Sequence, residues 1–194
     1  LKTETDVWGK VMEYGYDANS NRTQLKLDGT NYATYAYDNA DRLSGITNIA
    51  DSATVTYGYD NANRLISRSF PNGVLTSYEY DGMSRLKRQK DINATETLFD
   101  RQYGYNNANQ IAGITEPTRN RTFGYDNLDR LTSVVDTTNG NESYAFDAVG
   151  NRTSSHSSSS YSYQAYNRTT ATQTTTQGFD VNVNTVWKSE GSKR

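Results

Sequence analysis

Acidic and basic side chains recur along the chain four or five residues apart. Asp38 precedes Arg42 by four residues, as Asp60 precedes Arg64, and the interval is five from Asp17 to Arg22 and from Asp147 to Arg152. Such a spacing can bring the two groups together across a tight turn, where the carboxylate can also accept hydrogen bonds from turn amides. Paired carboxylates can also perform acid–base hydrolysis. Because these acids return regularly among turn residues, we predict a structural role and no catalytic residue.

Two other groups could carry chemistry. His156 is the only histidine, and it lies in a serine-rich run with no acid and nucleophile at a triad spacing. The segment Asp17-Ala18-Asn19-Ser20-Asn21 opens like a calcium-binding loop, with Asp28 at the twelfth position. Arg22 replaces the glycine that such a loop requires at its sixth position, and an aspartate substitutes poorly for the final bidentate glutamate. We predict no metal site and no cofactor.

The Asp–Arg pairs belong to a longer phrase: an aromatic residue, any residue, a second aromatic residue, Asp, a short polar stretch and Arg. The copies begin at steps of 21, 22, 21, 25, 20, 21 and 17 residues. This period is too short for a pair of helices and suits two strands with two turns. The phrase starts at Tyr14, Tyr35, Tyr57, Tyr78, Tyr103, Phe123, Tyr144 and Tyr161. The residues that we predict to form its structural motif are Tyr16, Asp17, Arg22, Tyr37, Asp38, Arg42, Tyr59, Asp60, Arg64, Tyr80, Asp81, Arg85, Tyr105, Tyr125, Asp126, Arg130, Phe146, Asp147 and Arg152.

The elements that position these residues follow from their periodicity. Tyr-x-Tyr alternates with period two, so both rings project from one face of a strand. The polar stretch is a turn, and the residues after Arg form the returning strand. Asp28-Gly29, Asn72-Gly73 and Asn139-Gly140 are hairpin dipeptides that lead to the next copy. The sequence therefore predicts an all-β, repeat-built antiparallel hairpin meander with tyrosines in rows along it.

The predicted organisation has three parts. Residues 1–13 form a lead-in strand and turn, in which Val7, Trp8 and Val11 could pack on the first repeat. Residues 14–168 hold eight repeats in one sheet array. Residues 169–194 form a Thr/Gln-rich tail, where the alternation from Phe179 to Trp187 suggests a terminal strand.

The composition excludes several classes of protein. Only 34% of the 194 residues are hydrophobic and mean hydropathy is −0.90, yet sixteen residues are Tyr, whose rings can supply buried area. A net charge of −2 gives no case for nucleic acid. No cysteine is present, and no apolar run reaches membrane-spanning length. Because the chain starts at Leu1 without a signal-peptide pattern, we expect an internal or processed piece.

The phrases Tyr-Gly-Tyr-Asp-x-x-x-x-Arg and Tyr-x-Tyr-Asp-x-x-x-Arg-Leu resemble the YD repeat of the Rhs family, which includes bacterial Rhs proteins, the BC shell of insecticidal toxin complexes, and teneurins. The resemblance covers about residues 14–168. It implies a hairpin strip wound into a spiral, here a curved open sheet that is a fragment of an Rhs cocoon. Bacterial shells of this family enclose a C-terminal toxic effector, whereas teneurin shells are extracellular and serve adhesion. The family's Asp-Pro-x-Gly closing signature is absent, so no self-cleaving residue is implied.

We therefore predict a structural wall segment that encloses or displays another polypeptide, and no enzyme. Its expected partners are neighbouring YD-repeat segments, further copies paired through open strand edges, and an encapsulated effector, with no nucleic acid and no membrane span. A secreted or cell-surface location is expected. Two alternatives stay open: an extracellular adhesion module that binds glycans or proteins through aromatic rows, and a self-assembling filament or oligomer.

Overall fold

The structure is a computed structural model that describes residues 2–164, 168–172, 175–179 and 185–190. The described residues contain strands and turns and no helix. The chain divides into two compact units, Leu1–Gln102 and Tyr103–Arg194. The first unit holds β1 (Lys2–Thr5), β2 (Val11–Tyr16), β3 (Arg22–Leu27), β4 (Thr30–Tyr37), β5 (Leu43–Asn48), β6 (Thr54–Tyr59), β7 (Leu65–Ser69), β8 (Leu75–Tyr80) and β9 (Leu86–Ile92). After β10 (Thr97–Tyr105), which crosses the boundary, the second unit holds β11 (Ile111–Glu116), β12 (Arg119–Tyr125), β13 (Leu131–Asp136), β14 (Glu142–Phe146), β15 (Arg152–Ser155), β16 (Tyr161–Gln164), β17 (Arg168–Thr172), β18 (Thr175–Phe179) and β19 (Thr185–Glu190).

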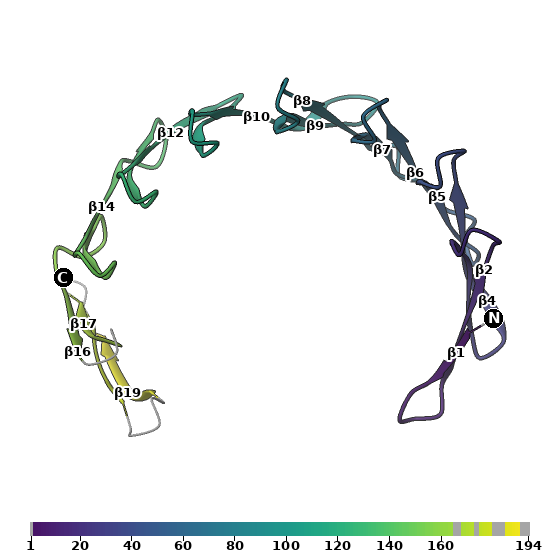
Figure 1. Cartoon of the computed structure of the whole chain (residues 1–194), viewed down its shortest axis with the longest axis horizontal. Helices are drawn as coiled ribbons and strands as arrows, with labels where there is room; N and C mark the ends of the chain where they lie inside the picture. Colours follow the sequence, from purple (N-terminus) through teal and green to yellow (C-terminus); the bar gives the residue numbers. More distant parts are fainter. Residues whose placement is uncertain (1, 165–167, 173–174, 180–184, 191–194) are drawn as a thin grey trace. The chain divides into compact units, whose positions relative to one another are not determined.

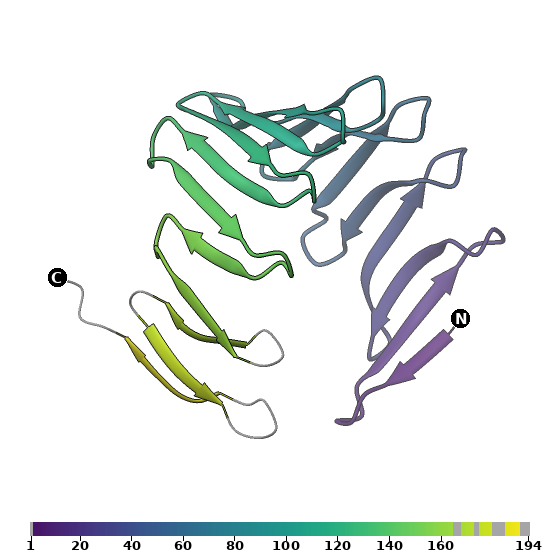
Figure 2. The same ribbon diagram turned by 60° about the vertical axis from the view of Figure 1, so that its left-hand side comes forward.

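Within each of two sheets, every strand pairs antiparallel with its neighbour in sequence. The hydrogen-bonded order follows the chain from β1 to β15, and β16 to β19 form a separate four-stranded sheet. Figures 1 and 2 show the hairpins following one another within each unit. The predicted all-β hairpin meander with an open sheet is therefore confirmed.

The strand order differs from the predicted single array in its last copy. Tyr161 and Arg168 lie in the four-stranded sheet and not in the long one. The serine-rich segment before Tyr161 closes on itself, because Ser155 and Ser158 exchange main-chain hydrogen bonds of 2.7 and 3.2 Å. These local bonds lie at the end of β15, the last strand of the long sheet. The strand expected from Phe179 to Trp187 falls partly on residues 180–184, which lie outside the described residues.

The polar stretch of each repeat forms one kind of turn. In the third copy, Asp60 N donates to Arg64 O at 3.0 Å and Asn63 N donates to Asp60 O at 3.1 Å. Asn63 has φ of +61°, a left-handed conformation that Asn, Asp, Ser and Gly tolerate best. The pairing shifts by one residue beside the turn, between Gly58 and Tyr59, which is a β-bulge. The residues with positive φ at this position of the successive turns are Ser20, Asp41, Asn63, Ser84, Asn109, Asp129 and Gly150.

The register gives the sheet two different faces. Tyr57 pairs with Arg68 and Tyr59 with Leu65 on one face, which we call the tyrosine face. On the opposite, small-residue face, Gly58 lies across from Ser67. Equivalent pairs of small residues are Ala36 with Gly45, Gly124 with Ser133, and Ala145 with Ser154; in the fourth copy Glu79 with Arg88 takes this place.

The sheet is a single layer with little fully buried apolar surface. Among the described residues, only Ala33 and Val134 are buried hydrophobic residues. Most motif tyrosines are half-buried, packed beside cross-strand neighbours. Such pairs stabilise a sheet by about 0.2–1 kcal/mol each, so the fold depends on many repeated contacts instead of one core.

The lead-in hairpin corrects one expectation. Val7 and Trp8 are 88% and 84% exposed, so the prediction that they pack on the first repeat is wrong. They occupy the tip of the turn from Asp6 to Lys10, which Gly9 closes with φ of +81°. A tip residue of such a turn points away from the sheet. Val11, at the start of β2, is half-buried.

Replacing Gly58 by Ala should cost about 1 kcal/mol of unfolding free energy, because overpacking forces a neighbour out of place. An added Cβ would overlap with Oγ of Ser67. Gly58→Ala should recover this loss when Ser67→Ala removes the hydroxyl, which a double-mutant cycle in urea would measure. Gly82→Ala is the matched control, since a Cβ there meets nothing within 4 Å. Equal effects at the two glycines would contradict the packing argument.

Candidate functional site

The repeated turn is the candidate functional site, and its aspartate holds it together. In the third copy, Oδ1 of Asp60 accepts the N–H groups of Ala62 at 2.9 Å and Arg64 at 3.0 Å. Oδ2 accepts Nε of Arg64 at 2.7 Å, and Nη2 lies at the same distance. One carboxylate therefore caps the turn and also binds the guanidinium side-on. The same geometry recurs in the pairs Asp38–Arg42, Asp81–Arg85 and Asp126–Arg130.

These contacts favour the ionised carboxylate. The hydrogen bond from the Arg42 side chain lowers the pKa of Asp38 below its ordinary value. In Asp60, Asp81 and Asp126 the largest cause of the lowered pKa is the backbone N–H of the arginine four residues on, assisted by its side chain. The turn aspartates are therefore charged throughout the neutral range.

The structure corrects the pairing expected in the two copies with a five-residue spacing. Asn21, not Arg22, occupies the position across from Asp17, with N to Oδ1 at 2.8 Å and Nδ2 to Oδ2 at 3.2 Å. The turn closes through a hydrogen bond from Asp17 N to the Asn21 carbonyl at 3.0 Å, so the residue that faces the aspartate is the fourth after it and not the fifth. Arg22 comes one residue later, and its guanidinium lies 4.3 Å from the ring centroid of Tyr35.

The seventh copy repeats this arrangement. Asn151 donates to Asp147 through N at 2.8 Å and through Nδ2 at 3.0 Å. Arg152 instead places its guanidinium 4.9 Å from the ring centroid of Tyr144. The fifth copy is neutral: Asn106 accepts the N–H groups of Ala108 and Gln110, both at 3.0 Å. The turn geometry is therefore kept with or without a formal ion pair.

Within each unit, side chains also connect turns to the turns that follow them, in what we call the turn ladder. Arg42 donates through Nη1 to the carbonyl of Asp60 at 3.1 Å and to Oδ1 of Asn63 at 2.8 Å. Arg64 donates to Oγ of Ser84 at 3.1 Å. In each case the receiving residues belong to the following turn. The other contacts of the ladder are Asn19 and Asn21 with Asp41 in the first unit, and Gln110 with Asp129 and Arg130 with the Asp147 carbonyl in the second.

The second aromatic residues of several phrases make a parallel set of links to the preceding copy. The hydroxyl of Tyr59 donates to the carbonyl of Leu43 in the preceding copy at 2.9 Å. The guanidinium of Arg42 lies 4.7 Å from the centroid of the same ring, within the range of a cation–π contact. The equivalent hydroxyl bonds run from Tyr37 to Arg22 O, Tyr80 to Leu65 O, Tyr125 to Ile111 O and Tyr163 to Arg152 O. Equivalent ring contacts join Arg64 to Tyr80 and Arg130 to Phe146.

The second aromatic residues of the first and fifth copies are Tyr16 and Tyr105. Tyr16 in the first copy is 43% exposed and has Nζ of Lys2 at 5.8 Å from its ring centroid. Tyr105 ends β10 in a half-buried position.

The sequence interpretation missed two acidic groups. Asp6 caps the lead-in turn as the repeat aspartates do, accepting the N–H groups of Trp8 and Lys10, both at 2.9 Å. The side chain of Asp136 is only 1% exposed and pairs with Arg119 on the adjacent strand, which holds the pKa of Asp136 well below its usual range. The turn glycine Gly9, three residues after Asp6, could have indicated that Asp6 caps a turn. The partner of Asp136 depends on strand register, which no local motif encodes.

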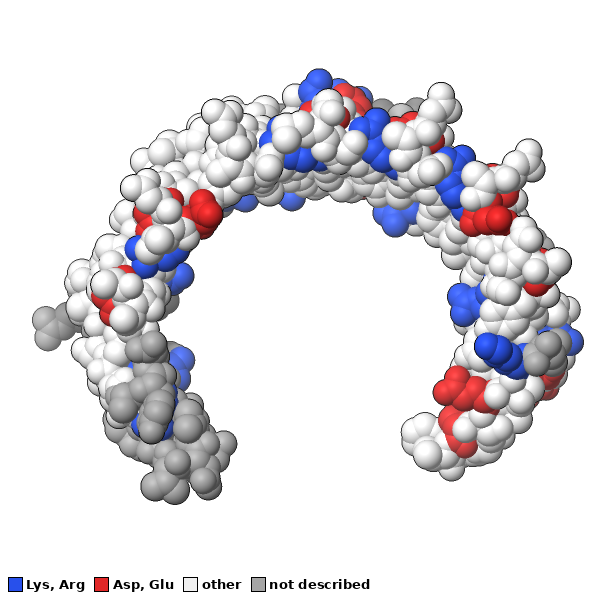
Figure 3. Space-filling model, viewed as in Figure 1, with Lys and Arg blue, Asp and Glu red and all other residues white. Residues whose placement is uncertain are grey.

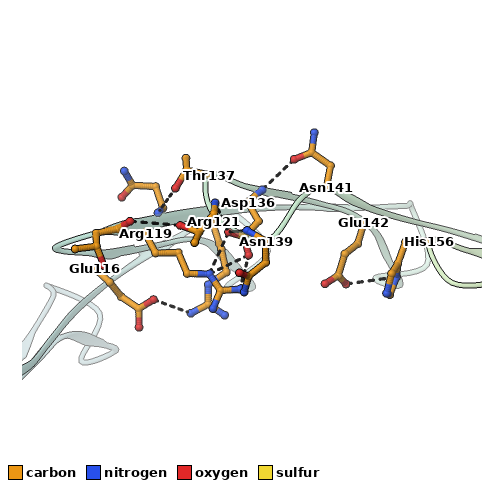
Figure 4. A network of polar contacts seen from close by, with 12 residues as sticks. Glu116, Arg119, Arg121, Asp136, Thr137, Asn139, Asn141, Glu142 and His156 are labelled. Carbon is orange, nitrogen blue, oxygen red and sulfur yellow. Dashed lines mark hydrogen bonds and ion pairs between the residues drawn. The ribbon is translucent and has the colours of Figure 1, made fainter.

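A network of polar contacts lies on the second unit (Figure 4). Nδ1 of His156 lies 3.8 Å from Glu142, which also contacts the Tyr144 hydroxyl. Ser155 Oγ bonds to the Tyr161 hydroxyl at 2.8 Å.

Within the residues that the structure describes, no group of three or more His, Cys, Asp or Glu side chains could hold a metal ion. Within the same ranges, no helix is long and apolar enough to cross a membrane.

Charges of both signs accompany the turns. Figure 3 shows acidic and basic atoms in adjacent clusters on the face that it draws. This arrangement follows from the Asp–Arg pairs, each of which places both signs within one turn. Such mixed charge does not produce the broad positive field that attracts nucleic acid.

Hairpins that are linked turn to turn, without a closed core, define a class of protein: a repeat-built β wall. A family model described as Teneurin YD-shell matches residues 9–178. The chain belongs to the Teneurin YD-shell family. Among the curated proteins compared with it, none matches.

Solved structures share this fold at low sequence identity. A chain of the crystal structure of TcdB2-TccC3 superposes with a TM-score of 0.73 at 14% identity, over 99% of this chain and 12% of that one. A chain of TcdB2-TccC3-Cdc42 gives 0.70 at 16%, over 95% and 12%. The Photorhabdus luminescens Tc holotoxin pore gives 0.64 at 16%, again over 95% and 12%. The chain thus spans about an eighth of the length of these matched chains.

Proposed function

We propose that this chain is a segment of a YD-repeat shell wall that encloses or displays another polypeptide. The observation that carries the proposal is the double connection between consecutive copies. The turn ladder joins their turns, and tyrosine hydroxyls bond to the carbonyls of the preceding copy. Together with the strand pairing, these links make a continuous sheet that needs no other layer to keep its register.

The mechanism is steric separation. A hydrogen-bonded sheet leaves no gap between neighbouring strands through which a chain could pass. In the second and third copies its two faces present different chemistry, with the motif tyrosines and leucines on one and glycine, alanine and serine on the other. A wall of this kind can therefore offer its contents a surface unlike the one that faces outwards.

The matched structures favour a toxin-type assembly, since those proteins are described as TcdB2-TccC3 complexes and a Tc holotoxin pore. By this analogy the partners are neighbouring YD-repeat segments and an enclosed effector, and the location is secreted or cell-surface. The motif residues act as structural ties in this proposal. We assign the segment no catalytic role, in keeping with a family defined by a structural shell domain.

The experiment uses the complete gene product that contains this segment. Protease treatment should spare any enclosed polypeptide in the wild type. The double variant Arg42→Ala and Arg64→Ala, which cuts two rungs of the turn ladder, should expose that polypeptide to cleavage. Lys87→Ala is the matched control, because Lys87 is exposed and lies outside every turn. Equally fast cleavage in all three proteins would refute enclosure by this wall.

Self-assembly is the second candidate, and it has one observation in its favour. β1 is the first strand of the long sheet, and all four of its residues are exposed. An exposed edge strand can pair with another copy. Light scattering over a range of concentrations would test this candidate, and a strictly monomeric chain would exclude it.

Glycan binding on the tyrosine rows is less favoured, because arginines cover rings such as Tyr59 and Tyr80.

A further inference from the structure

The hairpin turn between β13 and β14 contains a chemically reactive dipeptide. Asn139 and Gly140 are both exposed, and Gly140 has φ of +83°. In an Asn-Gly pair the glycine has no side chain to shield its amide nitrogen from the asparagine Cγ. The nitrogen can therefore attack that carbon more readily than in other Asn-x pairs.

The structure leaves both reacting groups of this pair unengaged. Among the contacts of the described residues, no hydrogen bond involves the Gly140 N–H or the Asn139 side-chain amide. Asn139 is anchored only through its own N–H, which donates to Oδ1 of Asp136 at 3.2 Å. Figure 4 shows Asn139 beside Asp136 and Arg119.

The chain contains a matched pair in which both groups are engaged. Asn72 and Gly73 are also exposed, and Gly73 has φ of +81°. The Gly73 N–H donates to the carbonyl of Phe70 at 3.0 Å, and Oδ1 of Asn72 accepts the N–H of Val74 at 3.2 Å. Attack at Asn72 must first break the hydrogen bond of the Gly73 N–H, whereas attack at Asn139 has no such bond to break.

We propose that Asn139 is a site of spontaneous deamidation in the folded chain. The Gly140 nitrogen forms a bond to Cγ of Asn139, the bond from Cγ to Nδ2 breaks, and ammonia leaves with the amide proton. Water then opens the resulting cyclic imide at either carbonyl, which gives aspartate or isoaspartate. No oxidant or reductant takes part. The reaction adds a carboxylate next to the buried, Arg119-paired Asp136, and the isoaspartate form lengthens the main chain within the hairpin.

Peptide mass spectrometry of the full chain, aged at mildly alkaline pH, tests the proposal. The folded chain should convert Asn139 about fivefold to tenfold faster than Asn72, which is the rate factor for one net hydrogen bond of about 1 kcal/mol that need not be broken. The same measurement in concentrated urea should bring the two rates together. Asn139→Gln should remove the fast phase, because its longer side chain forms the imide slowly.

Three results would overturn the proposal. Equal rates in the folded chain would show that the turn contacts do not control the reaction. Faster conversion at Asn72 would reverse the predicted order. A difference that persists undiminished in urea would mean that neighbouring sequence, and not the fold, sets the rate.

Discussion

Replacing Tyr59 by Ala should lower the free energy of unfolding by about 2–3 kcal/mol, somewhat less than truncation of a fully buried aromatic residue. The half-buried ring packs against its cross-strand neighbour Leu65, and Arg42 covers it. The substitution also leaves the Leu43 carbonyl without its hydroxyl donor. Urea denaturation followed by circular dichroism would measure the loss.

Two further variants separate the contributions at this position. Tyr59→Phe keeps the ring and removes only the hydrogen bond, so it should cost about 1 kcal/mol. Tyr32→Ala is the control, because Tyr32 is 55% exposed and lies outside the repeated phrase. If Tyr32→Ala cost as much as Tyr59→Ala, the rows of motif tyrosines would not be what stabilises the sheet.

Acidification should unfold the chain cooperatively as the pH falls below about 4, where unperturbed aspartates take up protons. The pKa values of Asp38, Asp60, Asp81 and Asp126 are lowered in the folded state. A lowered folded-state pKa stabilises the protein fully above the unfolded value, and this stabilisation is lost as pH falls through the folded value. Because several turns titrate in the same window, their effects accumulate.

The pH dependence of urea midpoints tests this expectation. The double variant Asp38→Asn and Asp60→Asn should be less stable at neutral pH and should take up about two fewer protons on unfolding in acid. Asn106→Ala disrupts the neutral turn of the fifth copy and should destabilise the chain without changing the slope against pH. An unchanged slope in the double variant would rule out the turn carboxylates as the source of acid sensitivity.

The repeat phrase was sufficient to predict the strands and turns. Tyrosine alternation indicated which residues share a face, and the polar stretch matched the left-handed turn position that Asn63 and its equivalents occupy. These features depend on residues that are close in sequence, so a short stretch of sequence is enough to predict them.

The side-chain hydrogen-bond partners within and between turns were harder to predict from the sequence. Aligning copies by residue type paired Asp17 with Arg22, whereas the main-chain bond that closes the turn selects Asn21. The turn ladder joins residues about a repeat apart, such as Arg42 and Asn63, and becomes visible only when strand register is known. The break after β15 likewise depends on serine contacts that no periodic pattern reports.

The tyrosine hydroxyls bond to main-chain carbonyls, and this choice of acceptor affects how the protein can evolve. The carbonyl belongs to Arg22 in one copy, to Leu43 or Leu65 in others, and to Ile111 further on. Every amino acid supplies this acceptor, so mutation of the side chain there leaves the bond intact. Copies can therefore drift apart, be duplicated or be exchanged without matched changes in their neighbours, which allows such shells to vary in length and sequence while their construction stays the same.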